Sequence, residues 1–78
     1  MTSTTAYLER IDRTRNLARY YRLSVVETLF GDWALVREWG RIGRNGQSRN
    51  EWFVDADEAR RALEAFARGK QKRGYRDC

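Results

Sequence analysis

The stretch Trp33–Gln47, with the sequence WALVREWGRIGRNGQ, constrains the fold of this chain more than any other. Its odd-numbered residues from 33 to 41 are Trp, Leu, Arg, Trp and Arg, and the even-numbered ones between them are Ala, Val, Glu and Gly. This alternation has the period of two of a β-strand with two unlike faces. Trp39 and Arg41 therefore point to the same side of the strand, with a glycine between them. Gly43 and Gly46 then allow the positive φ angles with which a chain turns back. The pattern predicts a strand that ends in an arginine-rich turn.

Three further segments have the composition of strands. Residues 20–29 are rich in β-branched and aromatic side chains, and the Gly-Asp pair that follows them predicts a hairpin to the next strand. Residues 6–12 and 47–54 alternate less regularly. Residues 13–19 lose the alternation altogether, so we expect a loop there.

The segment that follows the last strand has the pattern of an amphipathic helix. Asp55 and a Glu three residues later have the spacing of a capping box, in which the Asp side chain accepts a bond from a free backbone N–H. Leu63 and Phe66 fall on one apolar stripe of the helical wheel. We expect a helix over residues 56–72 that lays this stripe on the sheet.

The size and composition of the chain allow one thin core. It has 78 residues, of which 41% are apolar and 13% aromatic. We expect residues 6–76 to form a single domain after a flexible N-terminus of residues 1–5, and the protein to be a monomer. Cys78 is the only cysteine, so no intramolecular disulfide forms. The chain has neither an apolar run of membrane-spanning length nor the start of a signal peptide, which predicts a cytoplasmic protein without a membrane partner.

The net charge of +5 is concentrated in two stretches. Residues 37–49 hold four Arg and one Glu, and residues 60–76 hold seven basic residues and one Glu. Residues 50–59, between them, hold four acidic residues and no basic one. Clustered Lys and Arg are typical of proteins that bind phosphates, and the alternative is a solvated surface without a partner.

The sequence argues against catalysis. It contains no His and no internal Cys, and the acidic residues that do cluster lie at the expected helix start instead of forming an acid–base pair. No metal-ligand spacing occurs. The glycines at positions 40, 43 and 46 lead into a strand, whereas a phosphate-cradling loop leads into a helix. We therefore expect no enzyme activity, no metal and no cofactor.

Trp39 has two interpretations. Tryptophans are large core fillers, and all three in this chain could be interior. Trp39 differs because it shares a strand face with Arg41 beside an open turn. An aromatic ring next to an Arg that binds phosphate is a common way to hold nucleic acid. We expect Trp33 and Trp52 to lie in or near the core.

Together these motifs resemble the WGR domain, a small module named for the tripeptide found here at residues 39–41. The likeness covers residues 7–76, and its elements are Tyr20-Tyr21, Trp39 to Gly43, Gly46-Gln47, Phe53 before an acidic helix start, and Lys70 to Arg76 with its Gly74-Tyr75 ending. The domain is known from DNA-dependent poly(ADP-ribose) polymerases and from bacterial proteins. The resemblance implies an α+β fold, an antiparallel sheet of four or five strands with the C-terminal helix packed across one face.

The same resemblance implies roles for individual residues. In the polymerases the Trp of the tripeptide stacks against the sugar at a DNA strand end, and the Arg contacts the DNA backbone. Trp39 and Arg41 are the matching residues here. Arg19 matches a basic residue that touches DNA just before the aromatic pair, although the Asn that precedes it in the polymerases is Ala18 in this chain.

We expect a bacterial module that binds nucleic acid, DNA in preference to RNA, with little sequence specificity. The candidate nucleic-acid-binding residues are Trp39, Arg41, Arg19, Arg37, Arg44, Arg49 and Lys70, followed by the helix residues Arg61, Arg68 and Lys72. Lys70 lies on the apolar stripe and is expected to reach round the helix end toward the sheet. Two alternatives use the same residues: a protein-interaction module that docks an acidic partner surface, and an RNA binder that stacks bases on Tyr20, Tyr21 and Trp39.

Overall fold

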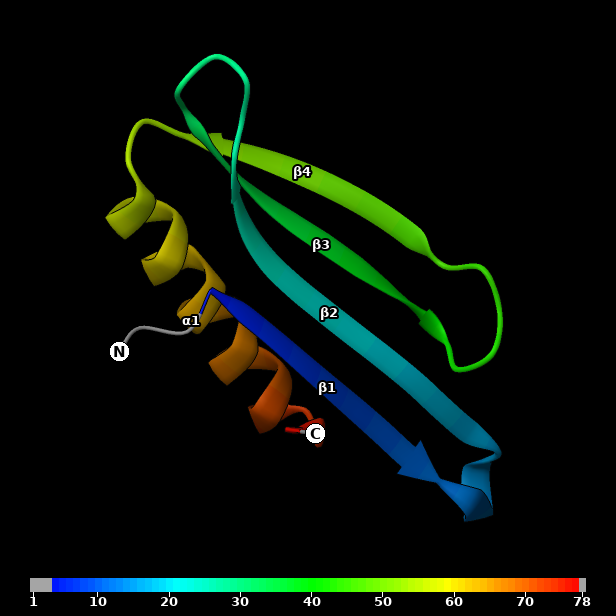
Figure 1. Ribbon diagram of the computed structural model, residues 1–78. Coiled ribbons are helices and arrows are strands. Elements are labelled where there is room, and N and C mark those ends of the chain that lie inside the picture. Colours follow the sequence, from blue (N-terminus) through cyan, green and yellow to red (C-terminus); the bar gives the residue numbers. More distant parts are fainter. Residues whose placement is uncertain (1–3, 78) are drawn as a thin grey trace.

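The computed structural model describes residues 4–77 and shows an antiparallel sheet with one α-helix across one face (Figure 1). The elements in chain order are β1 (Thr5–Asp12), η1 (Arg13–Arg15), β2 (Leu17–Glu27), β3 (Trp33–Arg41), β4 (Gln47–Phe53), α1 (Ala56–Lys72) and β5 (Arg76–Asp77). The order across the five-stranded sheet is β4-β3-β2-β1-β5. The predicted α+β fold is therefore confirmed, with five strands, and α1 has the predicted bounds.

The segment 13–19 differs from the expected loop, because η1 is a single 3-10 turn and β2 already begins at Leu17. The Asp12 side chain accepts a hydrogen bond from the backbone N–H of Thr14 at 3.1 Å. Asn16 then takes a left-handed conformation with φ 53°, which Asn tolerates better than most residues. The chain thus reverses within a few residues, and strand pairing resumes earlier than the polar sequence indicated.

The start of β1 lies close to the expected position. The strand begins at Thr5, one residue before the expected one, and the Thr4 carbonyl accepts a hydrogen bond from the N–H of Val25 at 2.8 Å. Residues 1–3 of the expected flexible N-terminus lie outside the described residues. Within residues 4–77 no helix has the length and apolarity that a membrane crossing requires.

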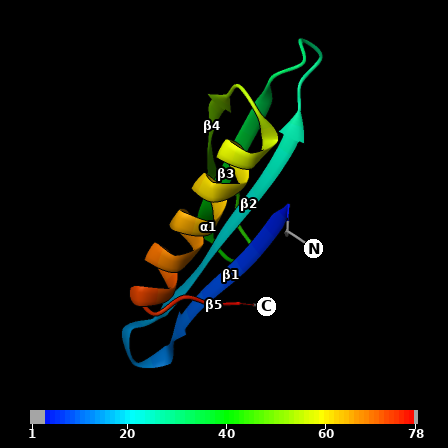
Figure 2. The ribbon, with the colours of Figure 1, turned by 90° about the vertical axis from the view of Figure 1, so that its left-hand side faces the viewer.

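The core lies between α1 and one face of the sheet (Figure 2). The antiparallel register places alternate residues of neighbouring strands on this face. The buried side chains that form this core cluster are Leu8, Tyr21, Leu23, Val25, Leu35, Ala59 and Leu63. The predicted stripe of the helix is confirmed, since Leu63 is 2% exposed and Phe66 packs against the cluster. Asp55 caps the helix by accepting a bond from the N–H of Glu58 at 2.8 Å.

The two other tryptophans do not share one environment. Trp33 is partly buried against the core, as expected. Trp52, which was also expected there, is 62% exposed on the opposite face of the sheet. The reason is the period of two: Phe53 packs against the core, so its neighbour on β4 must point the other way. No described element covers that face (Figure 2).

The glycines of the β3–β4 turn are required by close packing. A Cβ at Gly46 would lie 2.2 Å from the carbonyl oxygen of Trp39, and one at Gly40 would lie 2.8 Å from the Cα of Gly46. Gly43 has a φ of 85°, which side chains with a Cβ rarely adopt. Tyr20 covers the space over Gly40, its register partner on β2. The turn therefore folds tightly against the end of β3, directly behind Trp39.

The molecule is elongated, with extents of 45 × 25 × 16 Å. A helix the length of α1 spans about 25 Å, so it cannot cover the whole sheet. Figure 1 shows that β2 and β3 continue past the C-terminal end of α1 toward the β1–β2 and β3–β4 connections. We call this part of the molecule, residues 12–19 and 39–47, the turn end. Its helix-side face is left uncovered by α1.

Candidate nucleic-acid interface

Trp39 lies where the helix ends and the uncovered face begins. Its register partner on β2 is Tyr21, and the two rings stack with centroids 5.7 Å apart and planes 12° apart. Tyr75, which folds back after the helix, meets Tyr21 edge-on at 6.4 Å. Trp39 is half-buried against the core. Its ring is thus fixed in orientation by packing while part of it stays accessible.

Lys70 adds a cation to this aromatic cluster. Its Nζ lies 4.4 Å from the Tyr21 ring centroid and 5.7 Å from that of Tyr75, a cation–π geometry. The expectation that Lys70 reaches from the helix toward the sheet is confirmed. Burial lowers the pKa of Lys70, and the charges of Arg73 and Arg37 lower it further. An anion bound here would relieve that repulsion and stabilise the charged amine.

Arg37 is built into the protein interior. Its guanidinium donates hydrogen bonds to the Tyr21 hydroxyl at 3.2 Å and to the Glu51 carboxylate at 3.1 Å. It also lies over the Phe66 ring at 4.3 Å, and its side chain is only 14% exposed. In this structure Arg37 ties β2, β3, β4 and α1 together, and its expected contact with phosphate stays a prediction. The Arg37 guanidinium carbon also lies 5.8 Å from the Trp39 ring centroid, so it packs beside that ring.

Arg41 and Arg19 extend the surface toward the turn end. They are register partners on β3 and β2, both exposed, and they share the face of Trp39. Arg41 donates to the backbone carbonyl of Asn16 at 3.1 Å and to its side-chain oxygen at 3.3 Å. The left-handed Asn16 therefore orients Arg41, a contact that the sequence did not reveal.

Arg44 and Arg49 complete the set on the β4 side. Arg44 lies in the β3–β4 turn and Arg49 on β4 beside Arg37, and both are exposed. Within residues 4–77 the ion pairs with carboxylates involve Arg15, Arg22, Arg37 and Arg60. The other cations near Trp39 have no such pair in this part of the chain. We name Trp39, Arg19, Arg41, Arg44, Arg49 and Lys70 the turn-end surface.

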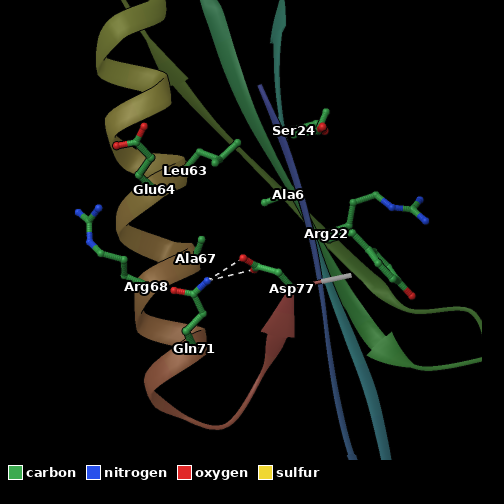
Figure 3. A pocket seen from close by; sticks show the side chains of 11 residues that line it. Ala6, Arg22, Ser24, Leu63, Glu64, Ala67, Arg68, Gln71 and Asp77 are labelled. Carbon is green, nitrogen blue, oxygen red and sulfur yellow. Dashed lines mark hydrogen bonds between the residues drawn. The ribbon is translucent and has the colours of Figure 1, made fainter. Parts of the chain in front are cut away.

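The remaining helix cations lie elsewhere. Arg61, Arg68 and Lys72 are exposed on the outer side of α1, away from its apolar stripe. Arg68 borders a separate hollow of about 730 Å³ between α1 and β1, where Gln71 donates to the Asp77 carboxylate at 3.0 Å (Figure 3). That hollow contains none of the turn-end surface.

The structure separates two residues that sequence reasoning had grouped. Tyr21 lies beside Trp39, whereas Tyr20 lies on the opposite face and stacks with Tyr7 at 6.2 Å. The three rings on which the RNA alternative stacks bases therefore do not lie on one face, as strand alternation requires. Arg73 borders a hollow of about 200 Å³ with Lys70 and Tyr21, and only the fold places it there.

The fold and this surface define a small α+β binding domain. A family model described as "WGR domain" matches residues 4–78, so the chain belongs to the WGR domain family, whose members are generally nucleic-acid-binding modules. It is 49% identical over 70 residues to the "Uncharacterized protein y4dW" of Sinorhizobium fredii, an alignment that covers 90% of this chain and 34% of that protein. The chain thus spans about a third of that relative. No solved structure matches it.

Proposed function

We propose that this protein binds nucleic acid, DNA in preference to RNA, through the turn-end surface. The supporting observation is that Trp39 stands among cations that have no carboxylate partner within residues 4–77, on a face that α1 leaves open. Arg and Lys side chains in this state are available to neutralise phosphates, and a fixed aromatic ring stacks on sugars or bases. Membership in the WGR family favours the same conclusion.

Each residue has a role in this proposal. Trp39 stacks on the exposed sugar at a strand end, with its ring held from behind by Tyr21. Arg41, oriented by Asn16, contacts the backbone phosphate next to that sugar. Arg19 binds the same strand. Arg44, Arg49 and Lys70 supply further phosphate contacts, while Arg37 keeps the aromatic rings in place.

Little sequence preference is expected from this surface. Base sequence is read mainly by a helix or ribbon placed in the major groove. Here α1 presents its apolar side to the sheet, and the turn-end surface offers a ring and cations that suit any backbone. If roughly three to five of these cations bind phosphates, the slope of log K against log salt is about −3 to −4.5.

A strand-end preference tests the proposal directly. Binding is measured to one DNA sequence as a linear fragment, a nicked circle and a closed circle. Linear and nicked DNA should bind more tightly than the closed circle, because only they present an unstacked terminal sugar. Equal binding to all three forms contradicts the strand-end mechanism.

The second candidate is a protein-interaction module whose cations dock an acidic partner. The exposed Arg and Lys side chains that support DNA binding suit such a partner equally well. Purified duplex DNA without any other protein separates the two candidates. Binding that saturates with the salt slope given above supports the nucleic-acid function, whereas no binding to duplex, nicked or hairpin DNA favours a protein partner.

A further inference from the structure

The outer edge of β4 has unused backbone hydrogen-bonding groups. The N–H of Ile42 donates to the carbonyl of Ala18 at 2.9 Å, in the same register as the β2–β3 ladder. Because bonding direction alternates along a strand, the even-numbered residues of β3 bond to β2 and the odd-numbered ones bond to β4. The odd-numbered residues of β4 are their partners. The even-numbered ones, Ser48, Asn50 and Trp52, therefore direct their N–H and C=O groups outward.

Nothing in residues 4–77 covers this edge. β4 is a terminal strand of the sheet, and its outer edge faces away from α1 (Figure 1). Ser48 and Asn50 are exposed, and the Trp52 ring is 62% exposed on the open face. A free strand edge is a template for pairing with another chain, and proteins usually block it with charges that repel a second copy.

The charges on β4 attract a second copy in one register. Arg49 and Glu51 flank Asn50 on the helix-side face. An antiparallel two-fold pairing centred on residue 49 would place Arg opposite Arg, and one centred on residue 51 would place Glu opposite Glu. A pairing centred on Asn50 places Arg49 of each copy opposite Glu51 of the other. Opposite charges in facing positions stabilise a pair of strands, and like charges destabilise it.

We propose that the protein forms a symmetric dimer through antiparallel pairing of two β4 edges centred on Asn50. Ser48 then faces Trp52 of the second copy, and each outward-directed pair exchanges two backbone hydrogen bonds, about six in all. The two sheets become one continuous sheet with both helices on the same face. This dimer replaces the monomer expected from the sequence. It shares Arg49 with the turn-end surface, and its test measures self-association in the absence of DNA.

The same register brings together other opposite charges. Phe53 of the second copy faces Gln47 of the first copy. The second chain then continues to Asp55, which lies beside the β3–β4 turn of the first copy, where Arg44 is. The acidic start of one helix, with Asp57 in its first turn, thus comes near the cationic turn of the other copy. The interface is small, so the dimer is weak and forms in a concentration-dependent way.

Sedimentation equilibrium of Arg49→Glu, Glu51→Lys and their equimolar mixture tests this register. Each variant alone places like charges opposite each other at both contacts and should dimerise at least about tenfold more weakly than the parent. In the mixed dimer the introduced glutamate of one copy faces the introduced lysine of the other, and the unchanged Arg49 faces the unchanged Glu51. Mixing should therefore restore dimers. A parent chain that stays monomeric up to millimolar concentration overturns the proposal, as does a mixture no more dimeric than its components.

A disulfide test covers the case in which Glu51→Lys unfolds by losing the contact with Arg37. In a Cys78→Ser background, Asn50→Cys places two thiols at the two-fold axis, where the Cα atoms are about 5.5 Å apart and within disulfide range. It should form covalent dimers under mild oxidation. Ser48→Cys is the control, because residue 48 is also exposed but faces residue 52 of the second copy, so its two thiols lie far apart. It should not form covalent dimers. Equal cross-linking of both variants, or of neither, overturns the proposal.

Discussion

Trp39 and Trp52 lie on adjacent strands but in opposite surroundings. Trp39 is on the helix-side face, stacked on Tyr21 and half-buried, with several cations around it that lack a carboxylate partner in residues 4–77. Trp52 is on the open face, 62% exposed, near the end of the molecule where Asp55 and the acidic first turn of α1 lie. The two residues have the same chemistry, so the difference in burial and local charge comes from their neighbours in the fold.

The difference extends to the two ends of the molecule. The turn end combines glycine-dependent backbone, a fixed aromatic ring and exposed arginines. The opposite end carries exposed apolar side chains, with Leu29 and Phe30 at the tip of the β2–β3 connection and Val54 after β4. Asp55, Asp57 and Glu58 at the start of α1 give this end a negative local charge. A polyanion is therefore attracted to the turn end and repelled from the other, which orients the protein before any contact forms.

The largest contrast is expected in stability. Leu63→Ala removes a fully buried side chain from the face of α1 that covers the sheet, and should lower the free energy of unfolding by about 2 to 5 kcal/mol. Leu29→Ala removes the same atoms from a fully exposed position and should change it by less than about 0.5 kcal/mol. Urea denaturation followed by circular dichroism measures both. Similar losses for the two variants would mean that the core lies elsewhere.

A smaller contrast is expected in DNA affinity between the two tryptophans. Trp39→Ala should weaken binding by about 1 to 3 kcal/mol through loss of stacking, and should also remove the preference for linear over circular DNA. Trp52→Ala, its matched control on the open face, should bind as the parent does. Each variant must first show a parent-like melting curve, because half-buried Trp39 also supports the core. A folded Trp39→Ala protein with parent affinity would contradict the assigned role.

The smallest contrast concerns single charges. Arg41→Ala should lower the slope of log K against log salt by about one unit, because one phosphate contact is lost. Arg61→Ala removes the same charge from the outer side of α1 and should leave the slope unchanged. Titrations at several salt concentrations distinguish them. Equal slopes for the two variants would show that net charge, and not the turn-end surface, attracts the DNA.

The sequence predicted those features that depend on local periodicity. Alternation along β3 and the stripe containing Leu63 depend on neighbours in the chain, so the strands, the helix bounds and the helix face could be predicted. The face that Trp52 occupies could be predicted only by knowing which of its neighbours on β4 packs inward. The burial of Arg37 depends on Glu51 and Phe66, which are distant in sequence and meet it only in the folded sheet.

The placement of the candidate residues could be predicted to the same extent. Trp39, Arg41 and Arg19 could be placed on one face because they lie on strands with a regular period. The contact between Asn16 and Arg41 joins the β1–β2 connection to the end of β3, and no pattern within either of these two segments indicates it. The contribution of Tyr75 depends on how the chain folds back after α1.

DNA binding at the turn-end surface is measured most directly by an NMR titration with a short DNA hairpin that presents one duplex end. The chain has three tryptophans, and their indole N–H resonances are assigned with single Trp→Phe variants. The turn-end surface predicts that the Trp39 resonance shifts progressively and saturates, while those of Trp52 and Trp33 stay nearly unchanged. A shift of the Trp52 resonance with the Trp39 resonance unmoved would place the DNA on the open face and contradict binding at the turn-end surface.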